Sequence, residues 1–335
     1  EIVGESIKDV LVAEVLTCEQ HPDADKLSIT TINFGGEEPV SVVCGAPNVR
    51  AGLKVAFAPI GSVLPGGIKI KKAKLRGQTS FGMICSESEL ELSDDSEGIL
   101  ELSNDALVGA LVIDHLNIRD VVFELDNKSL THRPDLWGHY GFARELSALL
   151  DRGLKPYVDD FSWPVSKSRM SLDIQAGNFC SKYRLVEASI GSGVQPSPKW
   201  LQRRLLAVGQ KPKNDIVDVS NYVMLELGQP THAFDADKIS GSTIRISASN
   251  PGEKIVTLDG SDCSLRESDY VVCDKDSNIA LAGVMGSGDS EVDDSTVRIA
   301  LESAAFNPTI VRRTALHHNL RSEASARFEK DLDPN

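Results

Sequence analysis

The sequence lacks the features of a membrane protein and of a zinc protein. No apolar run among its 335 residues approaches the roughly 20 residues that a bilayer-spanning helix needs. The six cysteines, at positions 18, 44, 85, 180, 263 and 273, form no C-x-x-C pair, and none has a histidine at ligand spacing. We therefore expect no metal site and no membrane association, and a reduced protein in the cytoplasm.

The chain also lacks an excess of positive charge: Asp and Glu number 49 against 35 Lys and Arg, and the net charge is −14. Such a balance argues against indiscriminate nucleic-acid binding over the whole surface. One run is different and holds five cations within eight positions: Lys69, Lys71, Lys72, Lys74 and Arg76. On the rim of a barrel this run could follow a phosphate backbone, but lysines also protect a solvated hairpin edge from aggregation. The sequence leaves these two interpretations equal.

The length predicts roughly two or three domains, and we divide the chain at 1–115, 116–165 and 166–335. In the first segment, short strand-like runs are separated by Gly, Pro and Asn turns, and no helix of ten or more residues is evident. These runs are 10–16, 27–34, 40–44, 55–58 and 82–86. The pattern is typical of a small closed β-barrel.

The middle segment reads as a strand at 121–125, a helix that begins at Pro134, and a linker containing Trp163-Pro164. His132, Arg133 and His139 could indicate a phosphate or metal site. We favour a structural role, in which they cap the helix start and form ion pairs.

The last segment alternates strands with helices and predicts a mixed α/β domain. The strand-like runs are 183–190, 243–248, 255–258, 270–273, 279–284 and 297–302, and the helices close at Gly209, cover 216–227 and follow Pro308. The predicted fold class is therefore multidomain α+β: a small barrel, a scaffold segment with a linker, and a mixed α/β domain.

Three stretches of the last segment carry unusual chemistry. In 228–235, Gly228 ends a helix and the turn delivers His232, which could position water or move a proton, or could bond backbone while Phe234 packs. In 281–286, Gly283 at a strand end lets backbone N–H groups approach a ligand, or forms a bulge. In 299–304, Glu302 follows an apolar strand and precedes a helix, where it is either a functional carboxylate or a helix-terminal charge.

Three sequence motifs of the first segment resemble those of a known domain. The stretches 21–27 (H-P-D-A-D-K-L), 43–50 (V-C-G-A-P-N-V-R) and 80–90 (S-F-G-M-I-C-S-E-S-E-L) together resemble the OB-fold tRNA-binding domain. That domain occurs in bacterial phenylalanyl-tRNA synthetase beta subunits, in methionyl-tRNA synthetase tails and in free tRNA-binding proteins. The three motifs indicate the domain and not its host.

The rest of the chain identifies the host family. Residues 131–146 resemble the N-R-P-D turn, helix and A-R-E of the bacterial phenylalanyl-tRNA synthetase beta subunit, with His132 in place of the usual Asn. Residues 218–235, 281–286, 301–306 and 320–329 resemble the editing module of that subunit. Ser220 replaces the usual Thr, and Ser287 stands where a second Gly is usual. The resemblance covers nearly all of the chain.

The resemblance implies a hydrolytic editing activity toward mischarged Tyr-tRNA(Phe). It assigns Glu302 as acceptor for the phenol hydroxyl and His232 as the group that orients water or the terminal ribose. Ser220 and Asn221 would hold the aminoacyl-adenosine end, and the Gly283 backbone would donate a hydrogen bond. The implied substrate-binding residues are Ser220, Asn221, Ala282 and Gly283.

The resemblance also implies partners. These are tRNA(Phe) and a separate alpha subunit that carries out aminoacylation, in a heterotetramer of two alpha and two beta chains. ATP and Mg²⁺ are expected for the complete enzyme and no cofactor within these residues, which we expect to be a piece of a longer chain. Two other hypotheses remain: a non-catalytic module that binds tRNA or a partner, and a free-standing deacylase.

Overall fold

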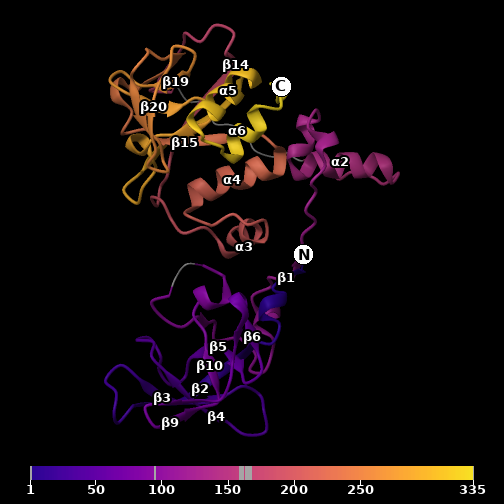
Figure 1. The fold of residues 1–335 in the computed structure, drawn as a ribbon, viewed down its shortest axis with the longest axis vertical. Coiled ribbons are helices and arrows are strands. Elements are labelled where there is room, and N and C mark those ends of the chain that lie inside the picture. Colours follow the sequence, from indigo (N-terminus) through magenta and orange to yellow (C-terminus); the bar gives the residue numbers. More distant parts are fainter. Residues whose placement is uncertain (1, 94–95, 158–161, 163–167, 335) are drawn as a thin grey trace. The chain divides into compact units, whose positions relative to one another are not determined.

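The computed structural model describes residues 2–93, 96–157, 162 and 168–334. The chain divides into two compact units, Glu1–Leu125 with Leu206–Lys211 and Asp126–Leu205 with Pro212–Asn335 (Figure 1). The predicted limit at 165/166 and the predicted linker dipeptide Trp163-Pro164 lie outside the described residues. The predicted α/β character is confirmed, and the domain limits stay predictions.

A six-stranded antiparallel sheet forms most of the first unit. Its order is β10-β5-β2-β3-β4, and β11 also pairs with β5. The strands are β2 (Leu11–Gln20), β3 (Ser28–Asn33), β4 (Val40–Cys44), β5 (Lys54–Pro59), β10 (Gly82–Ile84) and β11 (Glu101–Leu102).

The sheet is barrel-like and nearly closed. Next to β10, the Phe81 N–H donates to the Ser41 carbonyl at 2.9 Å, and the Val43 N–H donates to Ser80 Oγ at 3.1 Å. Strand β5 is buried on both faces: Phe57 points into the cluster inside the sheet, and Ala56 belongs to a second cluster. This alternation follows from the two-residue repeat of a strand.

Short elements complete the first unit. They are β1 (Ile2–Val3) with β12 (Asp120–Val121), β6 (Val63–Leu64) with β7 (Ile68–Lys69), β8 (Ala73–Leu75) with β9 (Gln78–Ser80), α1 (Val112–His115), and the 3₁₀ turns η1 (Glu5–Ile7), η2 (Pro65–Gly67) and η3 (Ser88–Leu90). Within the described part of this unit no helix reaches ten residues, as predicted.

The second unit contains two larger sheets. One is β14-β22-β15, which is antiparallel throughout; the other is β13-β16-β19-β20-β21, in which β13 and β16 run parallel. The strands are β13 (Ser171–Ile174), β14 (Cys180–Ser189), β15 (Thr231–Asp235), β16 (Thr243–Ala248), β19 (Tyr270–Cys273), β20 (Asn278–Leu281), β21 (Met285–Gly286) and β22 (Arg298–Phe306). A separate pair is β17 (Lys254–Val256) with β18 (Asp262–Ser264).

The helices begin and end at residues with clear capping chemistry. Asn214 Oδ1 accepts the Val217 N–H at the start of α4, and Gly228 ends that helix at φ 82°. Asn307 caps α5 directly after β22. The helices are α2 (His139–Leu149), α3 (Lys199–Ala207), α4 (Asp215–Leu227), α5 (Pro308–His318) and α6 (Glu323–Phe328), with 3₁₀ turns η4 (Lys128–Leu130), η5 (Pro134–Trp137), η6 (Ser240–Ser242) and η7 (Gly288–Ser290).

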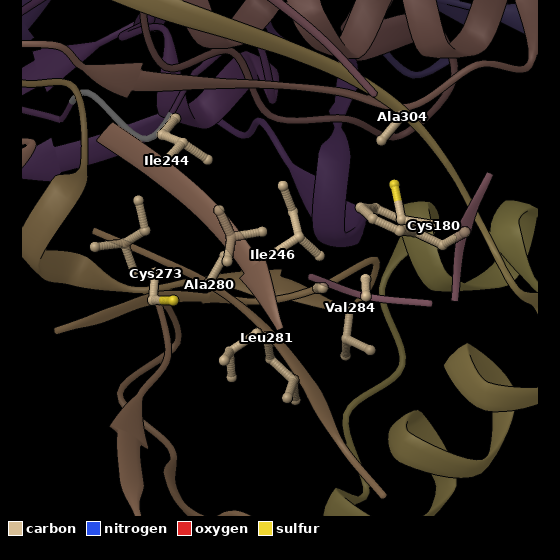
Figure 2. Packing of buried hydrophobic residues seen from close by; sticks show 14 of the residues in the cluster. Cys180, Ile244, Ile246, Cys273, Ala280, Leu281, Val284 and Ala304 are labelled. Carbon is tan, nitrogen blue, oxygen red and sulfur yellow. The ribbon is translucent and has the colours of Figure 1, made fainter. Parts of the chain in front are cut away.

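One apolar core joins both sheets of the second unit. Ile244 and Ile246 from β16 lie with Leu281 of β20 and Ala304 of β22 in the same cluster, as Figure 2 shows. Val311 of α5 belongs to it as well. The core therefore fixes the three-stranded sheet against the five-stranded sheet.

Some predicted elements are wrong. The strand predicted at 121–125 is limited to Asp120–Val121, and the helix predicted from Pro134 is a 3₁₀ turn followed by α2. Gly138 separates the two elements in an extended conformation. An added Cβ there would lie 2.4 Å from the Gly228 nitrogen, so glycine is required where the chain passes the end of α4. Glu302 lies within β22 and not between a strand and a helix.

Candidate active site on the three-stranded sheet

His232 and Glu302 lie opposite each other on neighbouring strands. In the antiparallel pair of β15 and β22, His232 is the register partner of Glu302. Directly opposite residues project from the same face with their Cβ atoms about 5 Å apart. Two candidate residues that are distant in sequence are thus brought together.

Glu302 is a buried carboxyl with an internal hydrogen-bond donor. Its exposed fraction is 8%, and its Oε2 accepts the Tyr183 hydroxyl of β14. Burial raises the pKa of Glu302 to about 7, and the Tyr183 hydrogen bond acts in the opposite direction. Near neutral pH Glu302 is therefore present both as the protonated carboxylic acid and as the ionised carboxylate, which accepts hydrogen bonds.

His232 presents an unused nitrogen. The residue is half-buried as a whole, but its Nε2 is buried and has no hydrogen-bond partner among the described residues. Its ring meets Phe234 edge-on at 4.5 Å. Burial lowers the pKa of His232 to about 4, so the imidazole is neutral at pH 7. A neutral imidazole can accept a proton from water or orient it.

Gly286 of β21 sets the place of the His232 ring. A Cβ built on Gly286 would lie 2.9 Å from His232 Cε1 and 3.0 Å from Nε2. Only a residue without a side chain lets the ring lie against this backbone. The hairpin of β20 and β21 is thereby linked to the site.

Gly283 lies in the turn between β20 and β21 at φ 71°, in the left-handed region. A Cβ there would meet Val311 at 2.9 Å and Phe306 at 3.0 Å, so glycine is required by both conformation and space. Its N–H makes no hydrogen bond to a described residue, whereas the Ala282 N–H donates to the Tyr270 carbonyl at 3.0 Å. Of these two positions, Gly283 is the one with a backbone donor to offer.

Ser220 and Asn221 lie on α4, which packs beside β15. Ile216 of that helix clusters with Ala233 and Leu301, which alternate with His232 and Glu302 along their strands. The start of α4 therefore packs on the opposite face of the sheet. Within the described parts of the chain, no hydrogen bond connects Ser220 or Asn221 to the His232–Glu302 pair, and their role stays a prediction.

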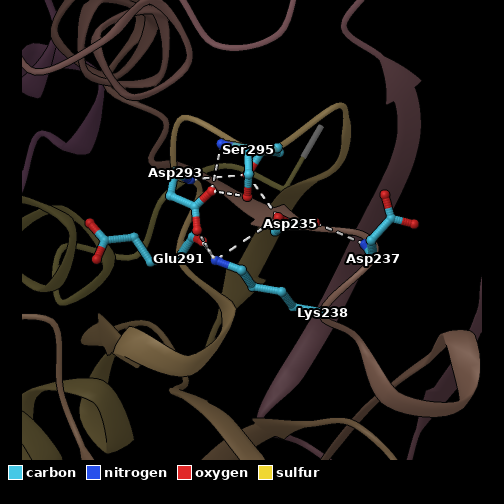
Figure 3. Close-up of polar contacts among 7 residues, drawn as sticks. Asp235, Asp237, Lys238, Glu291, Asp293 and Ser295 are labelled. Atoms are coloured by element: carbon cyan, nitrogen blue, oxygen red, sulfur yellow. Dashed lines mark hydrogen bonds and ion pairs between the residues drawn. The ribbon is translucent and has the colours of Figure 1, made fainter.

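Loop contacts hold the end of β15. Asp235 accepts the Thr296 hydroxyl at 2.7 Å, and Lys238 Nζ donates to the Glu291 carbonyl at 2.6 Å and pairs with Asp293 at 2.7 Å. Figure 3 shows how Lys238 reaches across to the 291–295 segment. These contacts tie the end of the strand that carries His232 to the segment that precedes β22.

Lys69, Lys74 and Arg76 lie on the two short hairpins of the first unit, and Lys71 with Lys72 lies in the segment that joins these hairpins. All five side chains are exposed, and none forms an ion pair with a carboxylate in the described ranges. Lys72 Nζ lies 4.8 Å from the centre of the Phe81 ring, and Arg76 with Gly77 makes a turn with two positive φ angles. A cavity of about 650 Å³ is lined in part by Lys69 and Lys71.

Three further observations bear on site chemistry. Among the described residues, no group of three His, Cys, Asp or Glu side chains could hold a metal ion, and all six cysteines are free thiols. No helix in the described ranges is long and apolar enough to cross a membrane.

Comparison with known families divides the chain in two. Residues 10–111 match a putative tRNA binding domain, and residues 182–335 match the B3/4 domain. The first match includes the run of five cations, and the second includes His232 and Glu302.

Known proteins of one kind match along nearly the full chain. The phenylalanine–tRNA ligase beta subunit of Anaeromyxobacter dehalogenans is 45% identical, over 100% of this chain and 42% of the relative. The beta subunits of Syntrophotalea carbinolica and Bacillus cereus are 45% and 42% identical, over 99% and 100% of this chain and 41% and 42% of their own lengths. The chain belongs to the phenylalanine–tRNA ligase beta subunit family. It spans about two fifths of the length of these relatives.

A solved structure of an N-terminal fragment of the phenylalanyl-tRNA synthetase beta-subunit from Pyrococcus horikoshii is also similar. It is 18% identical with a TM-score of 0.34, over 58% of this chain and 60% of that chain.

Two residues that contact Glu302 or His232 were not identified from the sequence. Tyr183 stood at the start of the strand predicted at 183–190, and Gly286 was the last residue of the 281–286 stretch, but neither was a candidate. The alternation of strand residues could have placed Tyr183 on the same face as residue 185. Its contact with Glu302 depends on the pairing of β14 with β22, for which the sequence carries no local signal.

Proposed function

We propose that this chain is the tRNA-binding and editing part of a phenylalanine–tRNA ligase beta subunit, and that its second unit hydrolyses Tyr-tRNA(Phe). The observation that carries the proposal is the pairing of a buried carboxyl, Glu302, with a neutral histidine, His232, on adjacent strands. Membership of the family and the match to the B3/4 domain support it.

The physical need for editing follows from the substrates. Phenylalanine and tyrosine differ by one hydroxyl, and a pocket shaped for the apolar side chain rejects an added hydroxyl by only about a hundredfold. A second site that binds the hydroxyl reverses the preference. A buried acceptor such as Glu302 can form a hydrogen bond with a phenol hydroxyl but not with a phenyl ring. Leaving a buried acceptor without this hydrogen bond costs about 1–3 kcal/mol, and more when the acceptor is charged.

The chemistry is ester hydrolysis by water. The oxygen of water adds to the ester carbonyl, the bond to the terminal ribose oxygen breaks, and tyrosine and free tRNA result. His232 would orient this water through its unused nitrogen, and Glu302 with the Gly283 N–H would hold the phenol. Ser220, Asn221 and Ala282 would contact the aminoacyl-adenosine end.

The deciding experiment measures hydrolysis of Tyr-tRNA(Phe) and Phe-tRNA(Phe) by the complete ligase. Glu302→Ala is expected to abolish discrimination between the two, and His232→Ala to slow hydrolysis of both. Glu267→Ala, at an exposed glutamate of the same unit, is the matched control. Equal rates and equal discrimination in all four proteins would reject the site.

The tRNA contact is assigned to the exposed cations Lys69, Lys71, Lys72, Lys74 and Arg76. Their exposure, the absence of carboxylate partners among the described residues, and the match to a putative tRNA binding domain support this assignment. If tRNA binds with strong salt dependence but no deacylation occurs, the chain is the alternative, a non-catalytic binding module.

Aminoacylation in this proposal belongs to the alpha subunit. The complete enzyme would be a heterotetramer of two alpha and two beta chains that uses ATP and Mg²⁺, and no ATP or magnesium site is assigned to the residues of this chain.

A further inference from the structure

Glu302 is already bound by a phenol that belongs to the protein. Tyr183 lies on β14, where its register partner is Ala304 and the partner of Glu302 is Leu185. Tyr183 and Glu302 are thus diagonal neighbours on one face of the sheet, within reach of an aromatic side chain. The Tyr183 hydroxyl donates to Glu302 Oε2, and Oε1 makes no hydrogen bond to a described residue.

We propose that Tyr183 is a positioning residue that occupies one oxygen of the Glu302 carboxylate, so that the other oxygen alone receives the phenol of the substrate. The inference rests on the function proposed above. It adds a residue to the specificity machinery and gives that residue a defined role, because Tyr183 fixes the direction in which the carboxylate presents its free acceptor.

The surroundings of Tyr183 suit a fixed support. The residue is 8% exposed, and its ring lies 6.5 Å from the ring of Phe306, which in turn packs on Phe179 and Phe328. A ring packed in this way does not leave readily. Tyr183→Phe therefore removes the hydrogen bond and keeps the shape of the core.

The charge balance around Glu302 depends on this hydroxyl. The titratable groups that face Glu302 are Tyr183 and Cys180 from β14 and His232 from β15. Burial raises the pKa of both Tyr183 and Cys180, and His232 stays neutral, so none of the three supplies a positive charge. Among the described residues, the Tyr183 hydrogen bond is the interaction that lowers the pKa of Glu302 against the effect of burial.

The first measurement does not depend on editing. Infrared difference spectra over a pH series follow the carboxyl band of Glu302 in the complete ligase, identified by its loss in Glu302→Gln. The wild-type midpoint is expected near 7, and Tyr183→Phe is expected to move it upward. An unchanged midpoint would overturn the proposal.

The second measurement is the hydrolysis of Tyr-tRNA(Phe). Tyr183→Phe is expected to raise KM about tenfold or more at pH 7, as for loss of a hydrogen bond to a charged group, and part of the loss should be recovered at higher pH. Tyr270→Phe is the matched control, since Tyr270 stacks on Phe179 in the same cluster and its hydroxyl bonds no described residue. In the Glu302→Gln background, Tyr183→Phe should have no further effect.

The two measurements separate the two claims. A wild-type enzyme that leaves Tyr-tRNA(Phe) intact would refute the proposed function, and the infrared midpoint would still decide whether Tyr183 holds Glu302. A shifted midpoint with unchanged KM and kcat in an active enzyme would refute the specificity role of Tyr183.

Discussion

A single methyl group at Gly286 tests whether the β21 backbone holds His232 in place. The Cβ of Gly286→Ala would lie 2.9 Å from His232 Cε1 and 3.3 Å from Leu258 Cδ1, where ordinary contacts begin at 3.4 Å. The backbone of Gly286 is not in the left-handed region, so alanine itself is not strained there. The ring of His232 must therefore move by roughly half an ångström, and overpacking of this kind costs about 1–3 kcal/mol.

The assay has two parts. Urea unfolding should show the second unit of Gly286→Ala destabilised by that amount, and hydrolysis of Tyr-tRNA(Phe) should slow by about tenfold or more, since small misplacements at a reacting centre are costly. Gly288→Ala is the matched control, because a Cβ at exposed Gly288 meets nothing within 4 Å. If both variants unfold and hydrolyse alike, the contact between Gly286 and His232 does not position the ring.

Three further predictions follow from buried or exposed charge. The pKa of Glu302 rises from 4.5 to about 7 on folding, so the unfolding free energy contributed by Glu302 falls as the pH rises from 4.5 to 7. The pKa of His232 falls from 6.5 to about 4 on folding, so the unfolding free energy contributed by His232 rises as the pH rises from 4 to 6.5. The two slopes oppose each other from 4.5 to 6.5, so urea titrations should show a steeper rise with pH in Glu302→Gln and a fall in His232→Asn; identical slopes in both would contradict these shifts. Asp269→Asn should cost about 3–5 kcal/mol, because this carboxylate is fully buried and accepts from a guanidinium, a hydroxyl and an imidazole, and exposed Asp262→Asn should cost little; equal costs would refute the role of the network. Replacing the five cations of 69–76 by Gln should weaken tRNA binding and reduce the slope of log K against log salt by roughly 0.7–0.9 per lost phosphate contact, measured by filter binding; an unchanged slope would mean that tRNA binds elsewhere.

Local chemistry explains which elements were predictable. The ends of α4 and the start of α5 follow from Asn214, Gly228 and the Asn307-Pro308 pair, each acting within one turn of its own helix. The 243–248 and 270–273 strands were predicted to the residue. The break at Gly138 was not predicted, because the neighbour that Gly138 approaches, Gly228, lies ninety residues away in the sequence.

In the candidate site too, the residues were predictable from local sequence and their arrangement was not. Glu302 was expected between a strand and a helix, and the structure puts it in mid-strand, where His232 and Tyr183 reach it from two other strands. The sheet order β14-β22-β15 does not follow the order of the chain. No periodicity or motif within one segment encodes such an order, because strand pairing depends on which apolar faces are buried together.

The sequence by itself determined the family to which this chain belongs, the run of five cations, and the two side chains, His232 and Glu302, with chemistry to offer. Those are properties of residue type and short-range order. Only the tertiary structure decided that Tyr183 donates a hydrogen bond to Glu302 and that the His232 ring lies against the backbone of Gly286. It also decided that burial raises the pKa of the glutamate and lowers the pKa of the histidine. Each of these depends on desolvation and close approach between strands distant in sequence, and such contacts exist only once the two sheets have packed into one core.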